Sequence, residues 1–465
     1  MKPQLTFYRW GAGLLFLIFA PALQAQTFPK DSIRWNGDLK KFINLVFLGD
    51  GYQAGDLNKY QEHVGNTADY LFKFSPFKEY ADYFNVYAIK VPSAQSGADH
   101  PRTAVDCVPA AEHPLLVTEN YFNSTFDYSS IHRLLVPTNP GAVINVIIDN
   151  LPLYDQPLML VNSTFYGGSG GSTAATASIN TSSFEIMVHE IGHSFAGLAD
   201  EYWVNEFSAG ERANMSREKD PAKVRWKNWI GFNGVGVYPH GASGGQENWF
   251  RPHESCEMRF LNSEFCPVCK EAIVLRIMQH FGTPVLSRFP ADPSVTLMAD
   301  SIPFKVDLQK PNPNTLRTKW ILNGQLIFMN RDSILLRPNQ LLPGNNTLTF
   351  EVLDTTPLIR ADNHPTLNTH VLNWNIQLAS TGHDDASAWQ GLRVYPNPVF
   401  NELTLSMDGN PEKLKFEIHN ILGQIVFSGY LKDMIKVNTH AWIPGLYMLK
   451  IENGNDYTSR KILKQ

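Results

Sequence analysis

The stretch VHEIGHSFAGLADEYW, residues 188–203, decides how the rest of the chain is interpreted. His189 and His193 stand four residues apart, and Glu190 directly follows the first of them. On a helix this spacing places both imidazoles on one face, one turn apart, where both can reach the same metal ion. Glu190 is rotated about 100° away, so its carboxylate can hold and deprotonate a metal-bound water. The pattern predicts a zinc site that needs a third protein ligand.

The third ligand is expected soon after the helix ends. Gly197 can end the helix in a left-handed conformation and turn the chain back toward the metal. Asp200 follows this glycine by three residues, and zinc readily accepts a carboxylate oxygen, so we predict Asp200 as the third ligand. Glu201 is an alternative one residue further on. A glutamate from a separate later helix, Glu206 or Glu211, would be a thermolysin-like solution.

A methionine downstream supports a comparison with the metzincin peptidases. Met258 stands in the segment ESCEMRF, residues 254–260, which resembles the methionine-containing turn beneath the zinc of those enzymes. There its soft side chain would pack under the ligands; taken alone, it fits an ordinary core methionine equally well. Some metzincins carry a tyrosine two residues later that stabilises the oxyanion. Here that position is Phe260, which leaves Tyr202 as a candidate for the role.

The motif lies in a region of alternating strand and helix patterns, residues 26–285. Buried strands are expected at residues 42–52, 84–91 and 144–150. Between the first two strands, apolar residues recur at helical spacing. These residues are Leu57, Tyr60, Val64, Ala68 and Leu71. The order strand–helix–strand predicts an α/β fold for this region.

Two local features are expected next to the motif helix. The segment FYGGSGGSTAATASIN, residues 165–180, precedes it; its end is either an exposed edge strand or part of a flexible loop. A capping box is expected at the start of the helix, with Ser182 as the N-cap and Glu185 reaching back to it.

The remaining sequence is typical of all-β structure. Residues 286–380 contain short alternating strands separated by Asn-Gly, Pro-Gly and Asn-Asn turns, which predicts an immunoglobulin-like β-sandwich. A polar linker, residues 381–391, leads to a second and smaller β-sandwich at residues 392–465.

Composition and the N-terminal residues indicate export. The 465-residue chain has a formal net charge of -5 and no basic block, which gives no support to nucleic-acid binding. Lys2 and Arg9 precede a short apolar run, so residues 1–25 are predicted to be a cleaved secretory signal and Gln26 the mature N-terminus. No later stretch is long and apolar enough for a transmembrane helix. In an exported chain, structural disulfides are the default for the four cysteines, Cys107, Cys256, Cys266 and Cys269.

Four blocks of the sequence resemble the IgA-peptidase family of secreted bacterial metallopeptidases. They are LGDGY, VDCV, HEIGHSFAGLADEY and SCEMRFLNSEFCPVCKEAI, they occur in order, and the resemblance covers residues 28–281. It implies zinc endopeptidase chemistry on a metzincin-like fold, with an extracellular protein or peptide as substrate. It does not establish immunoglobulin A as that substrate.

The C-terminal region resembles the sorting domain of type IX secretion cargo, through the blocks VYPNP, NILGQIV, PGLYMLKI and KILK. The type IX secretion machinery is therefore an expected partner, and the expected location is outside the cell or on its surface. The predicted fold class is multidomain: an α/β metzincin-like zinc peptidase domain followed by two all-β sandwich domains.

Three functions compete on this evidence. An exported zinc endopeptidase, with Glu190 as general base, is preferred. A non-catalytic surface binding protein with a structural zinc is the first alternative. It is disfavoured because structural sites are usually closed by four protein ligands and have no use for a general base. A zinc amidase acting on cell-wall peptides shares the motif and is the second alternative.

Overall fold

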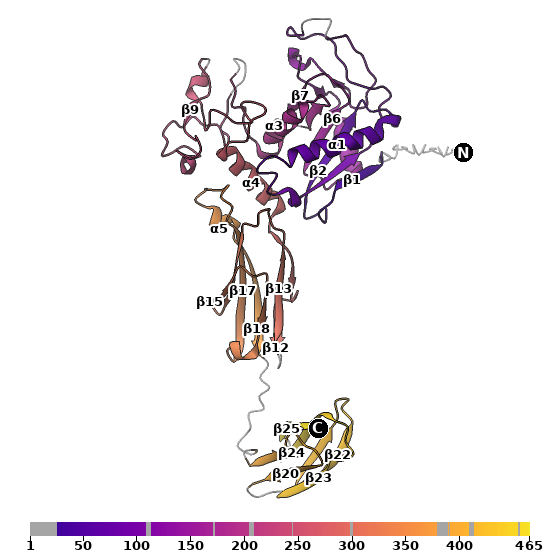
Figure 1. Ribbon diagram of the computed structural model, residues 1–465, viewed down its shortest axis with the longest axis vertical. Helices are drawn as coiled ribbons and strands as arrows, with labels where there is room; N and C mark the ends of the chain where they lie inside the picture. The colour runs from indigo at the N-terminus through magenta and orange to yellow at the C-terminus, as the bar shows by residue number, and fades with distance from the viewer. Residues whose placement is uncertain are drawn as a thin grey trace, which may run out of the picture.

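The protein consists of an α/β region followed by two β-rich regions. Figure 1 shows the first in indigo to magenta, the second in orange and the third in yellow. Residues 1–25, the predicted signal peptide, and most of the predicted linker lie outside the residues that are described. The computed structural model describes residues 26–107, 113–170, 173–203, 209–243, 245–297, 301–378, 389, 391–408, 413–453 and 456–465.

A six-stranded mixed sheet forms the centre of the α/β region, in the order β1-β3-β2-β6-β8-β7. The strands β3, β2, β6 and β8 are parallel, and the edge strands β1 and β7 are antiparallel to their neighbours. Strands β2 and β3 are buried along their whole length, as expected for parallel strands covered on both faces. The bounds are β1 (Lys30–Arg34), β2 (Ile43–Asp50), β3 (Phe84–Ile89), β6 (Gln156–Val161), β7 (Gly168–Gly170) and β8 (Ala175–Ser178).

Helices cover both faces of this sheet, because successive residues of a strand point to opposite sides. Leu45 and Phe47 of β2 belong to one apolar core with helices α1, α3 and α4. Val46 and Leu48 belong to a second core with helix α2. The helix bounds are α1 (Leu57–Leu71), α2 (Pro140–Asn150), α3 (Ser183–Ala196) and α4 (Pro267–Phe281). The predicted strands at residues 42–52 and 84–91 and the helix between them are therefore confirmed.

The predicted strand at residues 144–150 is wrong, because these residues belong to helix α2. The Asn139 side chain caps this helix by accepting a hydrogen bond of 3.2 Å from the backbone N–H of Ala142, and Pro140 occupies the first helical position. A short apolar run does not by itself distinguish a buried strand from a helix, whereas Asn-Pro is a recognised helix start. The buried side chains recur at helical spacing: Val143, Val146, Ile147 and Asn150.

The first β-rich region is a sandwich around Trp320 and Trp374. Its sheets have the orders β11-β13-β16 and β12-β18-β17-β14-β15. The bounds are β11 (Val285–Phe289), β12 (Ser294–Leu297), β13 (Ile302–Leu308), β14 (Leu316–Leu322), β15 (Gln325–Met329), β16 (Ser333–Leu336), β17 (Gly344–Asp354), α5 (His364–Asn368) and β18 (His370–Leu378).

The second β-rich region has its own apolar core, separate from the others. Its sheets have the orders β19-β20-β23 and β22-β21-β24-β25. We propose the domain boundaries expected from the sequence, since the buried members of each core lie within one of these ranges, apart from Ile359 in the first core and Trp389 in the last. The bounds are β19 (Leu392–Tyr395), β20 (Glu402–Met407), β21 (Leu414–His419), β22 (Ile425–Leu431), β23 (Met434–Asn438), β24 (Gly445–Asn453) and β25 (Asp456–Lys464).

The first sandwich contacts the α/β region through the segment between β17 and α5. Ile359 of this segment is part of the apolar core that contains α3 and α4. Glu271 of α4 accepts hydrogen bonds from the backbone N–H groups of Arg360 (2.6 Å) and Ala361 (2.8 Å). Within the described residues, no helix has both the length and the apolar character needed to cross a bilayer.

Candidate metal centre

Helix α3 carries the motif and ends as the sequence predicts. It packs on β7 and β8 and against α1 and α4. Gly197 follows the helix with a φ of +65°, a conformation that glycine adopts without strain. The N–H of Leu198 donates to the carbonyl of Gly192 (3.1 Å), and the N–H of Gly197 donates to that of His193 (2.9 Å). This turn reverses the chain and brings the following residues back to the helix.

The predicted capping box at the start of α3 does not form. Ser182 makes no side-chain cap hydrogen bond. Glu185 instead accepts hydrogen bonds from the Tyr70 hydroxyl and from the backbone N–H of Asn262 (3.3 Å). Because the same carboxylate contacts α1 and the loop before α4, it connects the helix start to two neighbours rather than to its own cap.

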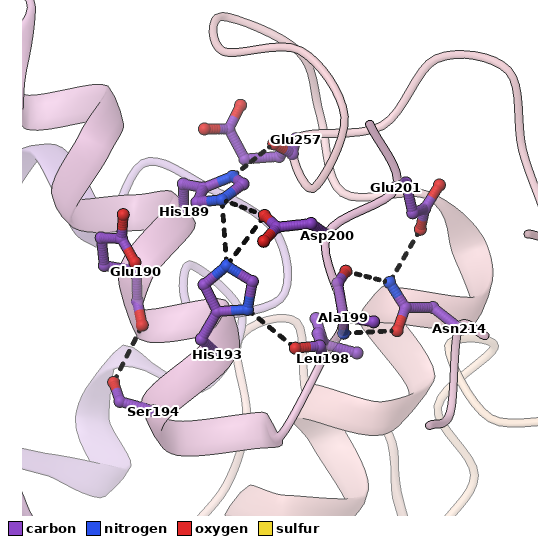
Figure 2. A network of polar contacts seen from close by, with 10 residues as sticks. All are labelled: His189, Glu190, His193, Ser194, Leu198, Ala199, Asp200, Glu201, Asn214 and Glu257. Atoms are coloured by element: carbon purple, nitrogen blue, oxygen red, sulfur yellow. Dashed lines mark hydrogen bonds and ion pairs between the residues drawn. The ribbon is translucent and has the colours of Figure 1, made fainter. Parts of the chain in front are cut away.

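Three side-chain atoms meet beside α3, as Figure 2 shows. The Nε2 atoms of His189 and His193 are 3.1 Å apart, and the Oδ1 atom of Asp200 lies 3.0 Å and 3.1 Å from them. Tetrahedral zinc with bonds of about 2.0–2.1 Å to nitrogen and oxygen separates its ligands by about 3.3 Å. The three atoms, called the donor triangle below, thus have nearly the spacing that one zinc ion requires.

Hydrogen bonds on the far side of each imidazole decide which nitrogen can bind a metal. The Nδ1 atom of His189 lies 2.9 Å from the carbonyl oxygen of Glu257, and that of His193 lies 2.8 Å from the carbonyl oxygen of Leu198. A carbonyl oxygen only accepts, so each Nδ1 carries a proton. When such a ring is neutral, its Nε2 lone pair is directed into the donor triangle and can bind a metal; when the ring is protonated, its Nε2–H donates to Asp200 instead. The residues therefore fit a metal cation.

The charges of the donor triangle depend on one another. Burial lowers the pKa of His193, but the hydrogen bond and the charge of Asp200 outweigh burial and raise this pKa to about 9. Burial also favours the neutral form of Asp200, yet the hydrogen bonds from the two histidines hold the pKa of this carboxyl well below its usual range. Asp200 is thus an anion that requires a positive partner, either a proton on a histidine or a metal ion.

Glu190 lies on the opposite side of the imidazoles from Asp200 (Figure 2). One of its carboxylate oxygens is within 4.8 Å of an imidazole nitrogen of each histidine, and burial raises the pKa of the carboxyl. Strand β7 passes directly beside it. A Cβ atom on Gly170 would lie 2.3 Å from Glu190 Oε2, so glycine is the residue that fits there. The Gly/Ser segment therefore contains the edge strand β7, which borders the donor triangle, whereas its end, expected as an exposed edge strand or a loop, is the buried inner strand β8.

The alternative ligands face elsewhere. Glu201 points away from the donor triangle in Figure 2 and is fully buried. Its Oε1 atom accepts hydrogen bonds from the Asn214 amide (3.0 Å) and from the thiol of Cys269 (3.3 Å), and burial raises its pKa well above the usual value. Glu211 pairs with Arg225 at 2.8 Å. Glu206 lies outside the described residues.

Met258 is fully buried directly beneath α3. Its Sδ atom lies 2.5 Å from the position that a Cβ on Gly192 would occupy, so this helix glycine makes room for the methionine. The preceding residue, Glu257, supplies the carbonyl that orients His189. Tyr202 stacks on His189 with 6.2 Å between ring centres. Phe260, in contrast, is 51% exposed and packs on Arg259.

Two pockets open beside the donor triangle, and Tyr202 lines both of them. The first, of about 340 Å³, is bordered by His189 and Glu190. The second, of about 380 Å³, is bordered by His193 and Asp200. Sequence reasoning assigned no role to their other polar lining residues, although Tyr166 and Arg259 lie within segments that it singles out. These lining residues are Arg133, Tyr166 and Arg259 in the first pocket and Arg212 and His240 in the second.

The predicted disulfides are wrong for this structure, in which all four cysteines are free. Cys256, Cys266 and Cys269 gather around the buried Glu201 carboxylate, and the sulfur atoms of Cys256 and Cys269 are 3.7 Å apart. Cys107 belongs to a different cluster, with three histidines. Two disulfides would need Cys107 to reach one of the other three, and the fold does not bring them together.

Comparison with known families gives two matches. Residues 32–235 match the family IgA Peptidase M64, a range that includes all three residues of the donor triangle and Glu190. The chain contains an IgA peptidase M64 domain. Members of this family are metallopeptidases, which are hydrolases. Residues 393–465 match a secretion system C-terminal sorting domain, which indicates that this M64 protein is secreted or attached to the cell surface through the type IX pathway.

Solved structures with some similarity to this chain include β-rich proteins. They include an I-band fragment of titin (10% identity, TM-score 0.16), which covers 39% of this chain while the chain covers 64% of the fragment. Clostridium thermocellum CbhA fibronectin(III)-like modules have 9% identity, coverages of 38% and 93%, and a TM-score of 0.15. The mixed-linkage glucan utilization protein SGBP-B of Bacteroides ovatus has 10% identity, coverages of 39% and 46%, and a TM-score of 0.14. At such scores these likenesses carry no argument. No curated protein matches the chain.

The packing of Met258 under α3 is testable with a pair of helix glycines. Gly192→Ala should lower the free energy of unfolding by about 1–3 kcal/mol, because the new methyl group must displace the methionine sulfur. Gly65→Ala, in α1, is the matched control. Nothing lies within 4 Å of a Cβ at that position, so the higher helix propensity of alanine should stabilise the protein by about 0.5–1 kcal/mol. Denaturant titration measures both, and stabilisation by both substitutions would contradict the packing.

Proposed function

We propose that the protein is an exported zinc endopeptidase whose ion is held by His189, His193 and Asp200, with Glu190 as general base. The observation that carries this proposal is the donor triangle, which has Glu190 on its open side. Three protein ligands and one open position are typical of catalytic zinc sites, and the combination of two imidazoles with a carboxylate suits zinc. Zinc, when bound, supplies a Lewis acid and lowers the pKa of a coordinated water.

Glu190 would move the proton. Its carboxylate takes a proton from the attacking water and later passes this proton to the nitrogen of the leaving amine. Burial raises the pKa of Glu190, so the carboxyl holds a proton more readily than an exposed one would between these two transfers. A structural zinc has no use for such a residue, which supports the peptidase over a non-catalytic binding protein. Tyr202, stacked on His189, is our candidate for donating a hydrogen bond to the oxyanion.

Cleavage within a peptide chain is supported by the space around the donor triangle. A pocket lies on each side of it, which leaves room for substrate residues both before and after the scissile bond. The edge strand β7 borders the same place. Its Gly168 is hydrogen-bonded on the outer side to Arg133 and Leu135, so the Gly170 end of the strand is the part offered to a substrate. An extended peptide could add to this edge by backbone hydrogen bonds. The turn at Gly197 and the methionine under α3 support the metzincin-like arrangement that we propose for the centre.

Glu190→Gln should reduce cleavage of internally quenched peptides with blocked termini by about a hundredfold or more, while zinc content stays normal. The reason is that the substitution removes the base and leaves the donor triangle intact. Turnover is measured by fluorescence, and metal by mass spectrometry of the dialysed protein. Cleavage near the wild-type rate would contradict the mechanism, and cleavage only of peptides with free termini would contradict an endopeptidase.

Asp200→Asn should lose zinc during dialysis against a weak chelator, because asparagine keeps the size of aspartate but lacks its charge. Glu201→Gln is the matched control one residue away. Burial raises the pKa of Glu201 well above the usual value, so the carboxyl is neutral and glutamine replaces it with little electrostatic change. This variant should keep zinc at the donor triangle. Loss of zinc from the Glu201 variant with retention in the Asp200 variant would refute our choice of ligand.

A further inference from the structure

A second cluster of metal-binding side chains lies outside the donor triangle. The chain between β3 and α2 contains little regular structure where it is described: the short strands β4 (Ser124–Thr125) and β5 (Val136–Pro137) and one 3-10 turn. Four side chains of this segment nevertheless meet, with one candidate ligand atom from each lying within 4.8 Å of all the others. They are His100, Cys107, His113 and His132.

The candidate ligand atoms of this cluster are separated by the distances expected around a single metal ion. His100 Nε2 lies 3.2 Å from His132 Nδ1 and 3.5 Å from the sulfur of Cys107. Tetrahedral zinc with bonds of about 2.0 Å to nitrogen and 2.3 Å to sulfur separates its ligands by about 3.3–3.6 Å. His100 Nδ1 donates to the carbonyl oxygen of Pro114 (2.9 Å), which leaves the lone pair of Nε2 directed into the cluster.

Hydrogen bonds to other residues satisfy only some of the ring nitrogens in this cluster. The buried carboxylate of Asp127 lies 3.0 Å from His132 Nδ1 and 3.6 Å from His100 Nε2, and its other oxygen accepts from the N–H of Thr103 (3.1 Å). The Nδ1 atom of His113, in contrast, is buried and has no hydrogen-bond partner among the residues that the structure describes. A buried nitrogen without a partner destabilises the fold, and a metal ion bound to the ring would remove that cost.

We propose that His100, Cys107, His113 and His132 bind a second zinc ion with a structural role. Three imidazoles and one thiolate close a four-coordinate site, as structural zinc sites are closed, and leave no position for a reacting water. Without the ion, His132 Nδ1 donates to Asp127, so zinc would replace the proton on this nitrogen. The thiolate of Cys107 and the carboxylate of Asp127 together balance the charge of a divalent ion. The site also explains why Cys107 stands apart from the other three cysteines.

The ion would cross-link residues 100 and 132 next to the first pocket. Arg133 follows directly and lines that pocket, and its carbonyl oxygen accepts a hydrogen bond from the N–H of Gly168 in β7 (3.1 Å). Leu134 forms a parallel bridge to the same glycine. The second zinc thus fixes the wall of the pocket beside the edge strand. This consequence for substrate binding rests on the proposed function, whereas the metal site itself does not.

Cobalt substitution of the full-length chain tests the site without relying on activity. Cobalt bound by a thiolate gives a charge-transfer absorption in the near ultraviolet, which the donor triangle, having no sulfur, does not give. The wild type should show this band. Cys107→Ser should lose the band and one zinc per chain, whereas Asp200→Asn should keep the band and lose the other zinc. A band that keeps its full wild-type intensity in Cys107→Ser would come from Cys256, Cys266 and Cys269 and would overturn the proposal.

Two further variants control for misfolding. Val105→Ser changes a residue that is 89% exposed and two positions from Cys107, so it should keep the band and both zinc ions. His113→Asn keeps Cys107 and removes one imidazole, which should weaken zinc binding at this site at least about tenfold in a chelator titration. Unchanged affinity in His113→Asn, or copper instead of zinc in the isolated protein, would refute the assignment. If Glu190→Gln cleaves normally while the band behaves as expected, only the proposed function fails.

Discussion

The two hydrogen bonds from the imidazole Nδ1 atoms to backbone carbonyls are the constraint on which the rest of the centre depends. They fix the tautomers of His189 and His193, so that both Nε2 lone pairs face the Asp200 carboxylate. One carbonyl, that of Leu198, is in place because Gly197 reverses the chain in a left-handed conformation. The other, that of Glu257, is in place because the next residue packs under α3 in the space left by a glycine. The end of α3 and the turn about 60 residues later therefore together orient the two imidazoles of the donor triangle.

The donor triangle is supported by the packing of α3 on the sheet, and two pockets open beside it. Helix α3 packs on the two last strands of the sheet, and the edge strand β7 passes within contact distance of Glu190. The segment that contains the second cluster leads through Arg133 into the hydrogen bonds with β7. This segment contains little regular secondary structure where it is described, and a bound ion is one way of holding such a segment in place. The account thus assigns catalysis to one metal and positioning of the pocket wall to another.

Sequence reasoning succeeded where the signal is local. The motif helix, the turn at Gly197, the helix around Val64 and the buried strands all follow from periodicity or from a residue with a special backbone preference. It failed where contacts between distant parts of the chain determine the local structure. The run before Asn150 is apolar enough for a strand, but its proline start and its burial pattern make it a helix. Glu185 found partners on other elements instead of its cap, and the cysteines joined clusters that only the folded chain assembles. No spacing rule connects Cys107 with His132, so the second cluster could not be predicted.

The central claim is that one zinc ion lies between His189, His193 and Asp200 in an otherwise open site. X-ray diffraction from crystals of the full-length protein, recorded on both sides of the zinc absorption edge, tests it most directly. The account predicts an anomalous peak about 2.0–2.2 Å from both Nε2 atoms and from an Asp200 oxygen, with no fourth protein ligand. A peak coordinated by Glu201 in place of Asp200, or zinc closed off by a fourth side chain, would contradict it.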